Sequence, residues 1–396
     1  MSRFTLHFLG MPHTSTHPSY AHCAYTAKVV KALRMFSRRG HICVDYSNEG
    51  AEVPVDVEHV DIFTEEERAA HFGPHDPQKL YHIVWDPSLP YWQEYNKRCV
   101  ERLLPRVKRG DFLLSLSGNC QVAPVGDAFP GSYGGTAQKV MMVEWGIGYY
   151  GTQSVYRIFE SHSHREWVMG RADHKVEDNS SAVVPNFFDM DEFPLNPPST
   201  QKTADIINAG PFYLFIGRVI ADKGFPEAIG VVESLRKSGV TDARLVIAGQ
   251  GCANLGEIPD FVIPFGSANV VERASLMANA IAVINPTRFR EPFGGTAVEA
   301  QLSGTPAITT DHGAFCETTP AEWRCASHRE LCTAAERALS LSDVDRMMIR
   351  ERAKGLYSLE AVAPMYERVF QRYMDRWGSG YYAPEPVDPE EVRNRP

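Results

Sequence analysis

Two cations lie close together in the second half of the chain, in the segment FIGRVIADKG at 215–224. An apolar run ends at Gly217, and Arg218 and Lys223 follow on a loop that leads into a helical pattern. Ligands of open α/β sheets bind beyond the carboxyl ends of the strands, where a helix N-terminus also favours anions. A forked guanidinium and a mobile ammonium at that place suit a diphosphate and the charge it gains on departure. Taken alone, a solvated basic turn explains the two residues equally well.

A pair of carboxylates follows in PTRFREPFGGTAVEAQLSGTPAITTDHGAF, residues 286–315. Seven residues separate Glu291 from Glu299, and Gly294 and Gly295 lie between them at a strand-to-helix turn. The glycines let backbone N–H groups approach a ligand closely, while carboxylates accept hydrogen bonds from sugar hydroxyls. The alternative is that Glu299 is a surface helix residue and Glu291 a capping carboxylate. Cations at one strand end and carboxylates with glycines at another together favour a diphosphate joined to sugars.

The elements that must position these residues form two α/β series. In the first, an apolar run at 4–9, a helical pattern at 21–37 and a second run at 41–46 predict a βαβ unit with a parallel sheet. The second series of alternating strands and helices begins after the Pro/Ser-rich stretch at 195–200. It predicts a doubly wound domain of its own. We could not organise residues 47–91, which are rich in His, Asp and Pro.

Composition narrows the class of protein. The chain has 396 residues, a net charge of −9 and a pI near 5.9, which favours two domains and argues against nucleic acid as a partner. No run reaches the roughly 18 apolar residues of a membrane span. We therefore expect a cytoplasmic protein with at most peripheral membrane association. The eight cysteines are dispersed, which favours reduced thiols over disulfides or a zinc site.

Several motifs, taken jointly in their order, resemble those of the retaining nucleotide-sugar glycosyltransferases of family 4. They are GR-x4-KG, EPFGGTAVEA and SGTPAITTDHGAFCE, with VVPNFFDMDEF before them and YSLEAVAPMYERVF after them. The resemblance implies the GT-B fold, an α/β fold in which two Rossmann-like doubly wound domains face each other across a cleft. The expected division is an acceptor-side domain at 1–194, a nucleotide-sugar-binding domain at 195–357, and a closing helix with an acidic, Pro-rich tail at 358–396.

The resemblance also implies roles for individual residues. Arg218 and Lys223 would bind the donor diphosphate, and Glu299 would bind the nucleotide ribose. The full expected donor set is Gly217, Arg218, Lys223, Gly251, Glu291, Phe293, Gly294, Gly295, Thr296 and Glu299. The implied reaction transfers a sugar from a UDP- or GDP-type donor with retention of configuration, through an oxocarbenium-like transition state. It would need no metal ion and no cofactor, and the acceptor would be a carbohydrate, a glycolipid or a small molecule.

The first half departs from the family pattern. The family usually has a Gly-rich loop after the first strand, whereas this chain has Gly10 followed by Met-Pro-His-Thr-Ser-Thr-His-Pro. The family often places a His at the end of a mid-domain strand, where VMMVEWGIGYYG offers Glu144. Glu144 would join Arg218, Lys223 and Glu291 as a catalytic residue if it acts as a base, or it is a buried carboxylate paired with Arg157. The acceptor-side candidates are His13, His22, Glu144 and Tyr149.

Two further motifs point to other chemistry. Residues 146–151 are literally GxGxxG, the dinucleotide fingerprint, but two tyrosines crowd the turn and no strand with a terminal acid follows. We interpret this segment as a loop lining the cleft. Asp189 and Asp191 form a DxD pair in the presumed linker and are interpreted as a capping or loop pair. The rival functions are a nicotinamide-dependent oxidoreductase and a non-catalytic nucleotide-sugar or glycan-binding protein with a degenerate acceptor domain.

Overall fold

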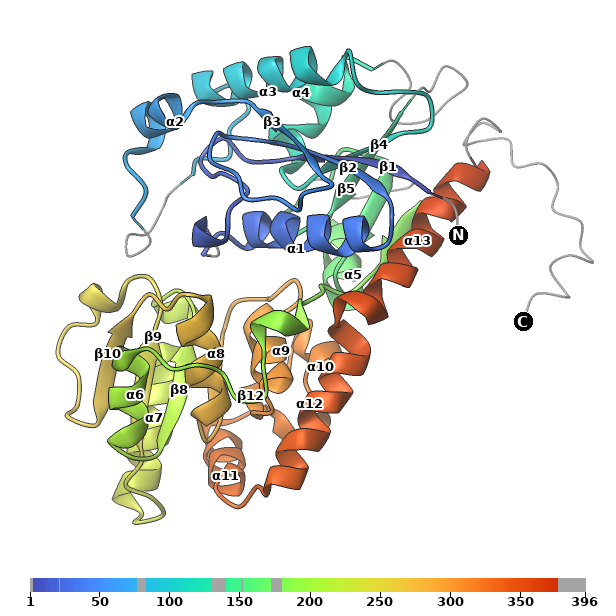
Figure 1. The fold of residues 1–396 in the computed structure, drawn as a ribbon. Coiled ribbons are helices and arrows are strands. Elements are labelled where there is room, and N and C mark those ends of the chain that lie inside the picture. The colour runs from blue at the N-terminus through green and yellow to red at the C-terminus, as the bar shows by residue number, and fades with distance from the viewer. Residues whose placement is uncertain are drawn as a thin grey trace, which may run out of the picture.

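The computed structural model describes residues 3–20, 22–76, 83–129, 140–150, 152–171 and 180–376. They form two α/β domains that lie one above the other in Figure 1. Each domain holds one sheet of parallel strands between two layers of helices. The predicted fold class, two Rossmann-like domains, is confirmed. Gly151 and the tail from 377 to 396 lie outside the described residues.

The first domain has a seven-stranded sheet in the order β3-β2-β1-β4-β5-β6-β7. Its strands are β1 (Thr5–Leu9), β2 (Ile42–Ser47), β3 (Glu58–Asp61), β4 (Phe112–Ser115), β5 (Met141–Trp145), β6 (Tyr156–Phe159) and β7 (Ser181–Val183). Its helices are α1 (Ala24–Arg38), α2 (Glu65–Phe72), α3 (Pro90–Leu103), α4 (Val122–Gly126) and α5 (His162–Arg171). The central strands β1, β4 and β5 are almost entirely buried and mostly apolar, because helices cover both faces of the sheet.

The second domain has a six-stranded sheet in the order β10-β9-β8-β11-β12-β13. Its strands are β8 (Phe212–Ile216), β9 (Arg244–Ala248), β10 (Val262–Gly266), β11 (Val283–Asn285), β12 (Ala307–Thr310) and β13 (Arg324–Cys325). Its helices are α6 (Gln201–Asn208), α7 (Phe225–Lys237), α8 (Val270–Asn279), α9 (Gly295–Leu302), α10 (Phe315–Thr318), α11 (His328–Ala338) and α12 (Asp343–Tyr357). The order reverses beside β8, so the loops after β8 and β11 flank the switch point at which ligands of such sheets bind.

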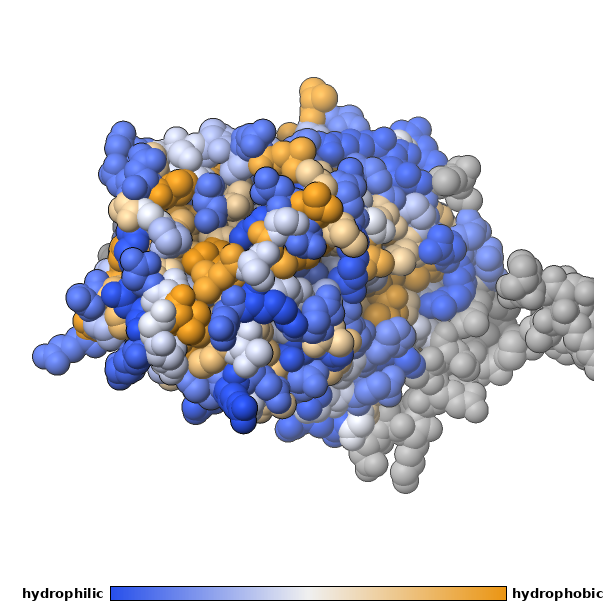
Figure 2. Space-filling model, turned by 90° about the horizontal axis from the view of Figure 1, so that it is seen from below, coloured by the Kyte–Doolittle hydropathy of each residue, from blue (hydrophilic) through white to orange (hydrophobic). Residues whose placement is uncertain are grey.

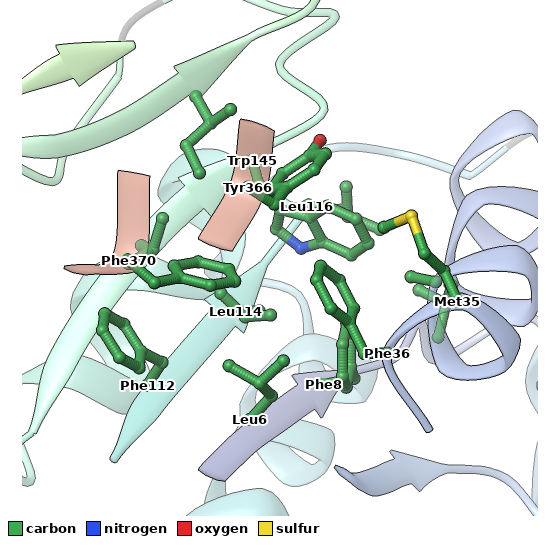
Figure 3. Packing of buried hydrophobic residues seen from close by; sticks show 14 of the residues in the cluster. Leu6, Phe8, Met35, Phe36, Phe112, Leu114, Leu116, Trp145, Tyr366 and Phe370 are labelled. Carbon is green, nitrogen blue, oxygen red and sulfur yellow. The ribbon is translucent and has the colours of Figure 1, made fainter. Parts of the chain in front are cut away.

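The last helix, α13 (Leu359–Arg376), leaves the second domain and lies along the first (Figure 1). Phe370 on this helix is fully buried, and its ring centroid lies 4.8 Å from that of Phe112 in β4 and 5.8 Å from that of Phe36 in α1. Figure 3 shows these rings packed with Trp145 and Tyr366 in one core. The end of the chain therefore belongs to the core of the first domain.

The chain crosses between the domains at two places that touch each other. The Phe188 N–H donates to Tyr357 O at 2.8 Å, and the Leu359 N–H donates to Phe188 O at 3.1 Å. A short 3-10 helix, η3 (Met190–Glu192), follows the first crossing. The two crossing segments, around Phe188 and around Ser358, are thus bonded backbone to backbone. We call them, together with η3, the hinge.

The surface seen from the side of the second domain is mixed (Figure 2). Hydrophobic residues form small patches there, separated by hydrophilic ones.

In the described part of the chain, none of the helices combines the length and the apolar character that crossing a membrane requires.

Candidate active site

The carboxyl ends of the two sheets face each other. Ser161, directly after β6, donates through Oγ to Pro292 O at 2.6 Å in the loop after β11. Gly148, in the loop after β5, lies against the same proline. A Cβ added to Gly148 would lie 3.6 Å from Pro292 Cγ. Glu317 of α10 accepts hydrogen bonds from the N–H groups of His162 at 2.8 Å and Ser163 at 2.7 Å, at the start of α5. The loops that end the strands of both domains therefore form a common surface.

Arg218 and Lys223 lie on the loop between β8 and α7, as the sequence predicts. Arg218 is exposed, and within the described chain its guanidinium has no hydrogen bond or ion pair. Burial raises the pKa of Tyr25 and the positive charge of Arg218 lowers it in part, so the first domain comes near Arg218. Lys223 ends the 3-10 turn η4 (Ala221–Lys223). Gly224 then needs to be glycine, because its φ is 84° and a Cβ would lie 2.4 Å from Pro286 O. That close approach brings the loop against the end of β11.

Lys223 meets Glu291 across the switch point. Its Nζ lies 2.5 Å from Glu291 Oε1, and the two side chains are 17% and 15% exposed. The ammonium also lies 4.4 Å from the ring centroid of Phe289. The pair shows that the loops after β8 and β11 are in direct contact and that both charges face solvent in part. An anion bound there would compete with Glu291 for the ammonium.

Gly294 and Gly295 shape the start of α9. Gly294 has φ 80°, and a Cβ at this position would come 2.4 Å from the Phe315 ring, so no larger residue fits. The first turn of α9, which includes Thr296, carries backbone N–H groups without helical partners, and it directly follows the loop that carries Glu291. Phe293 is buried at 3% exposure and packs beneath this turn rather than facing a ligand. Of the predicted donor-binding residues in this segment, Gly294 and Gly295 thus offer their backbone, whereas the Phe293 side chain is part of the core.

The ends of β8 and β9 also come unusually close. A Cβ on Gly249 would lie 1.7 Å from Gly217 O, and Gly217 itself has φ 148°. The Val219 N–H donates to Gln250 O at 2.8 Å, and Gly251 follows with φ 95°. These contacts fix the loop that carries Arg218.

Glu299 is neither exposed nor free of partners. It lies one turn into α9 with its side chain 14% exposed, and its Oε1 is 2.9 Å from Arg273 Nη1 of α8. Arg273 in turn donates through Nη2 to Glu192 Oε2 at 2.7 Å, in η3. The carboxylate expected to meet the ribose is therefore linked to the hinge.

Glu144 is fully buried in β5. It accepts hydrogen bonds from the Tyr149 hydroxyl at 3.3 Å and from the N–H groups of Gln153 at 3.0 Å and Ser154 at 3.1 Å. Burial raises its pKa to about 7. Arg157 does not pair with it among the described residues and donates to Ser154 O at 2.6 Å instead. This environment favours Glu144 as a carboxylate that ties the loop after β5 together over Glu144 as a base.

The other acceptor-side candidates lie on two loops. His13 and His22 belong to the loop after β1. Burial lowers the pKa of His13 to about 3 and that of His22 to about 4, and the charge of His22 lowers the pKa of His13 further. His22 also stacks with His75, with ring centroids 5.5 Å apart. Tyr149 instead lies over Gly118 in the loop after β4. Both predicted histidines are therefore neutral at pH 7.

The two competing motifs have structural roles. Gly146 and Gly148 lie in the loop between β5 and β6, and in the described residues 146–150 and 152–155 no helix starts, so the dinucleotide interpretation lacks its helix N-terminus. Asp189 caps η3, accepting from the Asp191 N–H at 3.2 Å, which confirms the capping interpretation. Both aspartates pair with Arg38 of α1, at 3.4 and 3.2 Å.

The sequence analysis missed Arg273, Glu192 and Glu317. Glu317 lies in a motif that was recognised, but nothing in the spacing shows that it binds the start of α5. Arg273 lies outside the quoted motifs, and Glu192 lies in VVPNFFDMDEF, far from Arg273 in the sequence. The sequence holds no signal for their pairing, because the pairing depends on the packing of α8 against η3.

The sequence of the second domain matches a known family. Residues 200–322 match the profile of the family described as glycosyl transferases group 1. The 2-deoxystreptamine glucosyltransferase of Streptomyces kanamyceticus is 28% identical over 149 residues, which cover 34% of this chain and 38% of that protein. The chain thus spans little more than a third of the length of this curated relative.

Solved structures resemble nearly the whole chain. The catalytic domain of starch synthase IV from Arabidopsis thaliana, bound to ADP and acarbose, has a TM-score of 0.68 at 12% identity and covers 95% of this chain and 100% of that chain. HepE of Anabaena, in complex with UDP and glucose, has a TM-score of 0.63 at 14% identity, with coverages of 93% and 100%. At such identities the likeness establishes the fold, which is that of the GT-B glycosyltransferases.

Proposed function

We propose that this chain is a glycosyltransferase that uses a nucleoside-diphosphate sugar, of the UDP or GDP type, as its donor. The observation that carries the proposal is the contact of Lys223 with Glu291 beside the unpaired Arg218 and the start of α9. Two cations and a helix N-terminus supply what a diphosphate needs, and the carboxylate of Glu291 would accept from the hydroxyls of the attached sugar. The family match of residues 200–322 and the ADP and UDP held by similar structures support the same class of donor.

In the proposed reaction the bond between the anomeric carbon of the sugar and the diphosphate oxygen breaks, a bond to the acceptor hydroxyl oxygen forms with retention of configuration, and the hydroxyl proton passes to the departing diphosphate. As the bond to the diphosphate breaks, negative charge grows on the leaving phosphate, and Arg218 and Lys223 stabilise it. Glu291 loses its partner ammonium to the diphosphate and becomes free to accept from the donor sugar. Glu299 accepts from the ribose, and closure of the domains excludes water from the donor. The acceptor would be a carbohydrate, a glycolipid or a small molecule.

The first test is binding. We would measure thermal unfolding with millimolar UDP, GDP, ADP, dTDP or NAD, since a ligand at about 100 times its Kd adds about 2.7 kcal/mol of stability. We expect a shift with one nucleoside diphosphate and none in the variant Arg218→Ala with Lys223→Ala, whose own Tm stays near the wild type. Lys237→Ala with Lys354→Ala is the matched control, because these cations are exposed and remote from the site. A shift with NAD alone, or an undiminished shift in the first variant, would refute the proposal.

The second test separates a transferase from a binding protein. Release of the nucleoside diphosphate from its sugar donor is followed with a panel of acceptors, with and without EDTA. We expect acceptor-dependent release that EDTA leaves unchanged, because the two cations neutralise the leaving group. Tight nucleotide binding without transfer to any acceptor would favour the non-catalytic alternative. Loss of activity in EDTA that added metal restores would contradict the metal-independent mechanism.

A further inference from the structure

Arg273 joins two carboxylates that belong to different parts of the fold. Its Nη1 lies 2.9 Å from Glu299 Oε1 in α9, and its Nη2 donates to Glu192 Oε2 at 2.7 Å in the segment that crosses between the domains. All three side chains are largely buried, between 14% and 17% exposed. A planar guanidinium can hold two carboxylates in fixed directions, which an ammonium cannot. The orientation of Glu299 is therefore set by the hinge segment through Arg273.

Glu299 keeps one oxygen for another partner. Oε1 is the oxygen that lies 2.9 Å from Arg273 Nη1, and among the described residues no hydrogen bond is made to Oε2. Lys31 of α1 also faces Glu299 and Glu192 but forms no ion pair with either within 4 Å. Without Arg273, Glu299 would thus be a mostly buried carboxylate with no bonded counter-charge, and its side chain would be free to turn.

We propose that Arg273 is a positioning residue for the nucleotide ribose: held by Glu192, it fixes Glu299 so that the free oxygen accepts from the ribose hydroxyls. The inference rests on the proposed function, in which Glu299 binds the ribose. It adds that recognition of the ribose depends on the segment between the domains, since Glu192 belongs to that segment. The same guanidinium therefore connects donor recognition to the hinge.

The test measures ribose discrimination in the full-length chain. Titration calorimetry gives the Kd of UDP, GDP and ADP. For the nucleotide that binds best, the Kd of its 2′,3′-dideoxy counterpart is measured as well. Discrimination is the Kd of the dideoxy nucleotide divided by that of the natural one. We expect a ratio of about tenfold or more in the wild type. In Arg273→Met we expect the ratio to fall to within about threefold of unity, with binding of the dideoxy nucleotide unchanged. A merely structural role would weaken both nucleotides alike.

Three further variants separate the possible failures. Arg38→Met is the matched control, because Arg38 pairs with Asp189 and Asp191 beside the hinge but not with Glu192, and it should keep the wild-type ratio. Glu192→Ala leaves Arg273 in place, so it decides the matter if Arg273→Met does not fold, and it should lower the ratio at least threefold. If Glu299→Ala, which removes the accepting oxygens, keeps the ratio, the proposed ribose contact fails. If Glu299→Ala loses it while Arg273→Met and Glu192→Ala keep it, only the role of Arg273 is overturned.

Discussion

Replacement of Glu144 by Gln tests whether this residue holds a loop or serves as a base. Burial raises the pKa of Glu144 from the ordinary 4.5 to about 7, so the folded protein holds this proton more tightly than the unfolded chain. Stability is therefore lost as the pH rises from about 4.5 to about 7, and the full penalty applies above that range. A difference of this size corresponds to about 3 kcal/mol. Gln is neutral at every pH and can still accept from the Ser154 N–H.

The assay is urea unfolding of both proteins from pH 4 to pH 8. We expect the free energy of unfolding of the wild type, taken relative to Glu144→Gln, to fall by about 3 kcal/mol over this range. Glu351→Gln is the control, because Glu351 is exposed and should show no such difference. Sugar transfer should persist in Glu144→Gln, since a residue bonded to Tyr149, Gln153 and Ser154 supports the loop. A parallel pH dependence of the two proteins would refute the burial argument, and loss of transfer with normal stability would make Glu144 the base.

Two further predictions concern packing. Gly249→Ala should abolish nucleotide binding or folding, since its Cβ would lie 1.7 Å from Gly217 O, whereas Gly355→Ala, at an open helical position, should add about 0.5–1 kcal/mol to the free energy of unfolding. Equal thermal shifts with nucleotide in both variants would contradict this. Phe370→Ala should cost about 3–5 kcal/mol in urea unfolding, because the ring is fully buried in the first domain, while Val344→Ala at an exposed site should change little. A small loss for Phe370→Ala would show that α13 is not part of that core.

The elements with strong hydrophobic patterns were predictable, and the edge elements were not. In the second predicted series, segments 244–248 and 307–310 form β9 and β12, which are buried on both faces and so leave a clear apolar signal in the sequence. In β3 only Val60 is buried, and in α2 the one buried residue is Arg68, so neither leaves an apolar period in the sequence. Segment 47–91 could not be organised for that reason.

Local spacing predicted parts of the site, but long-range ion pairs lay beyond it. Lys223 and Glu291 follow neighbouring strands, and the carboxyl ends of neighbouring parallel strands meet at one edge. Nothing comparable links Glu299 to Glu192, because their connection runs through α8 and depends on how that helix packs. Glu144 shows the same limit, since its type suits a base and only its full burial and three bonded donors suggest otherwise.

The loop after β1 has no Gly-rich turn, and its polar groups are bonded within the first domain. Residues 11–16 are buried, and the amide of Asn48 donates to Pro12 O at 2.9 Å and Thr14 O at 3.0 Å. Thr16 donates to Asp45 at 2.9 Å, so much of the polar capacity of this loop is used within the first domain. A loop committed in this way has few free donors for a phosphate. In the proposed reaction, the charge on the departing diphosphate would then fall mainly to Arg218 and Lys223, which is why we expect their joint removal to abolish nucleotide binding rather than merely weaken it.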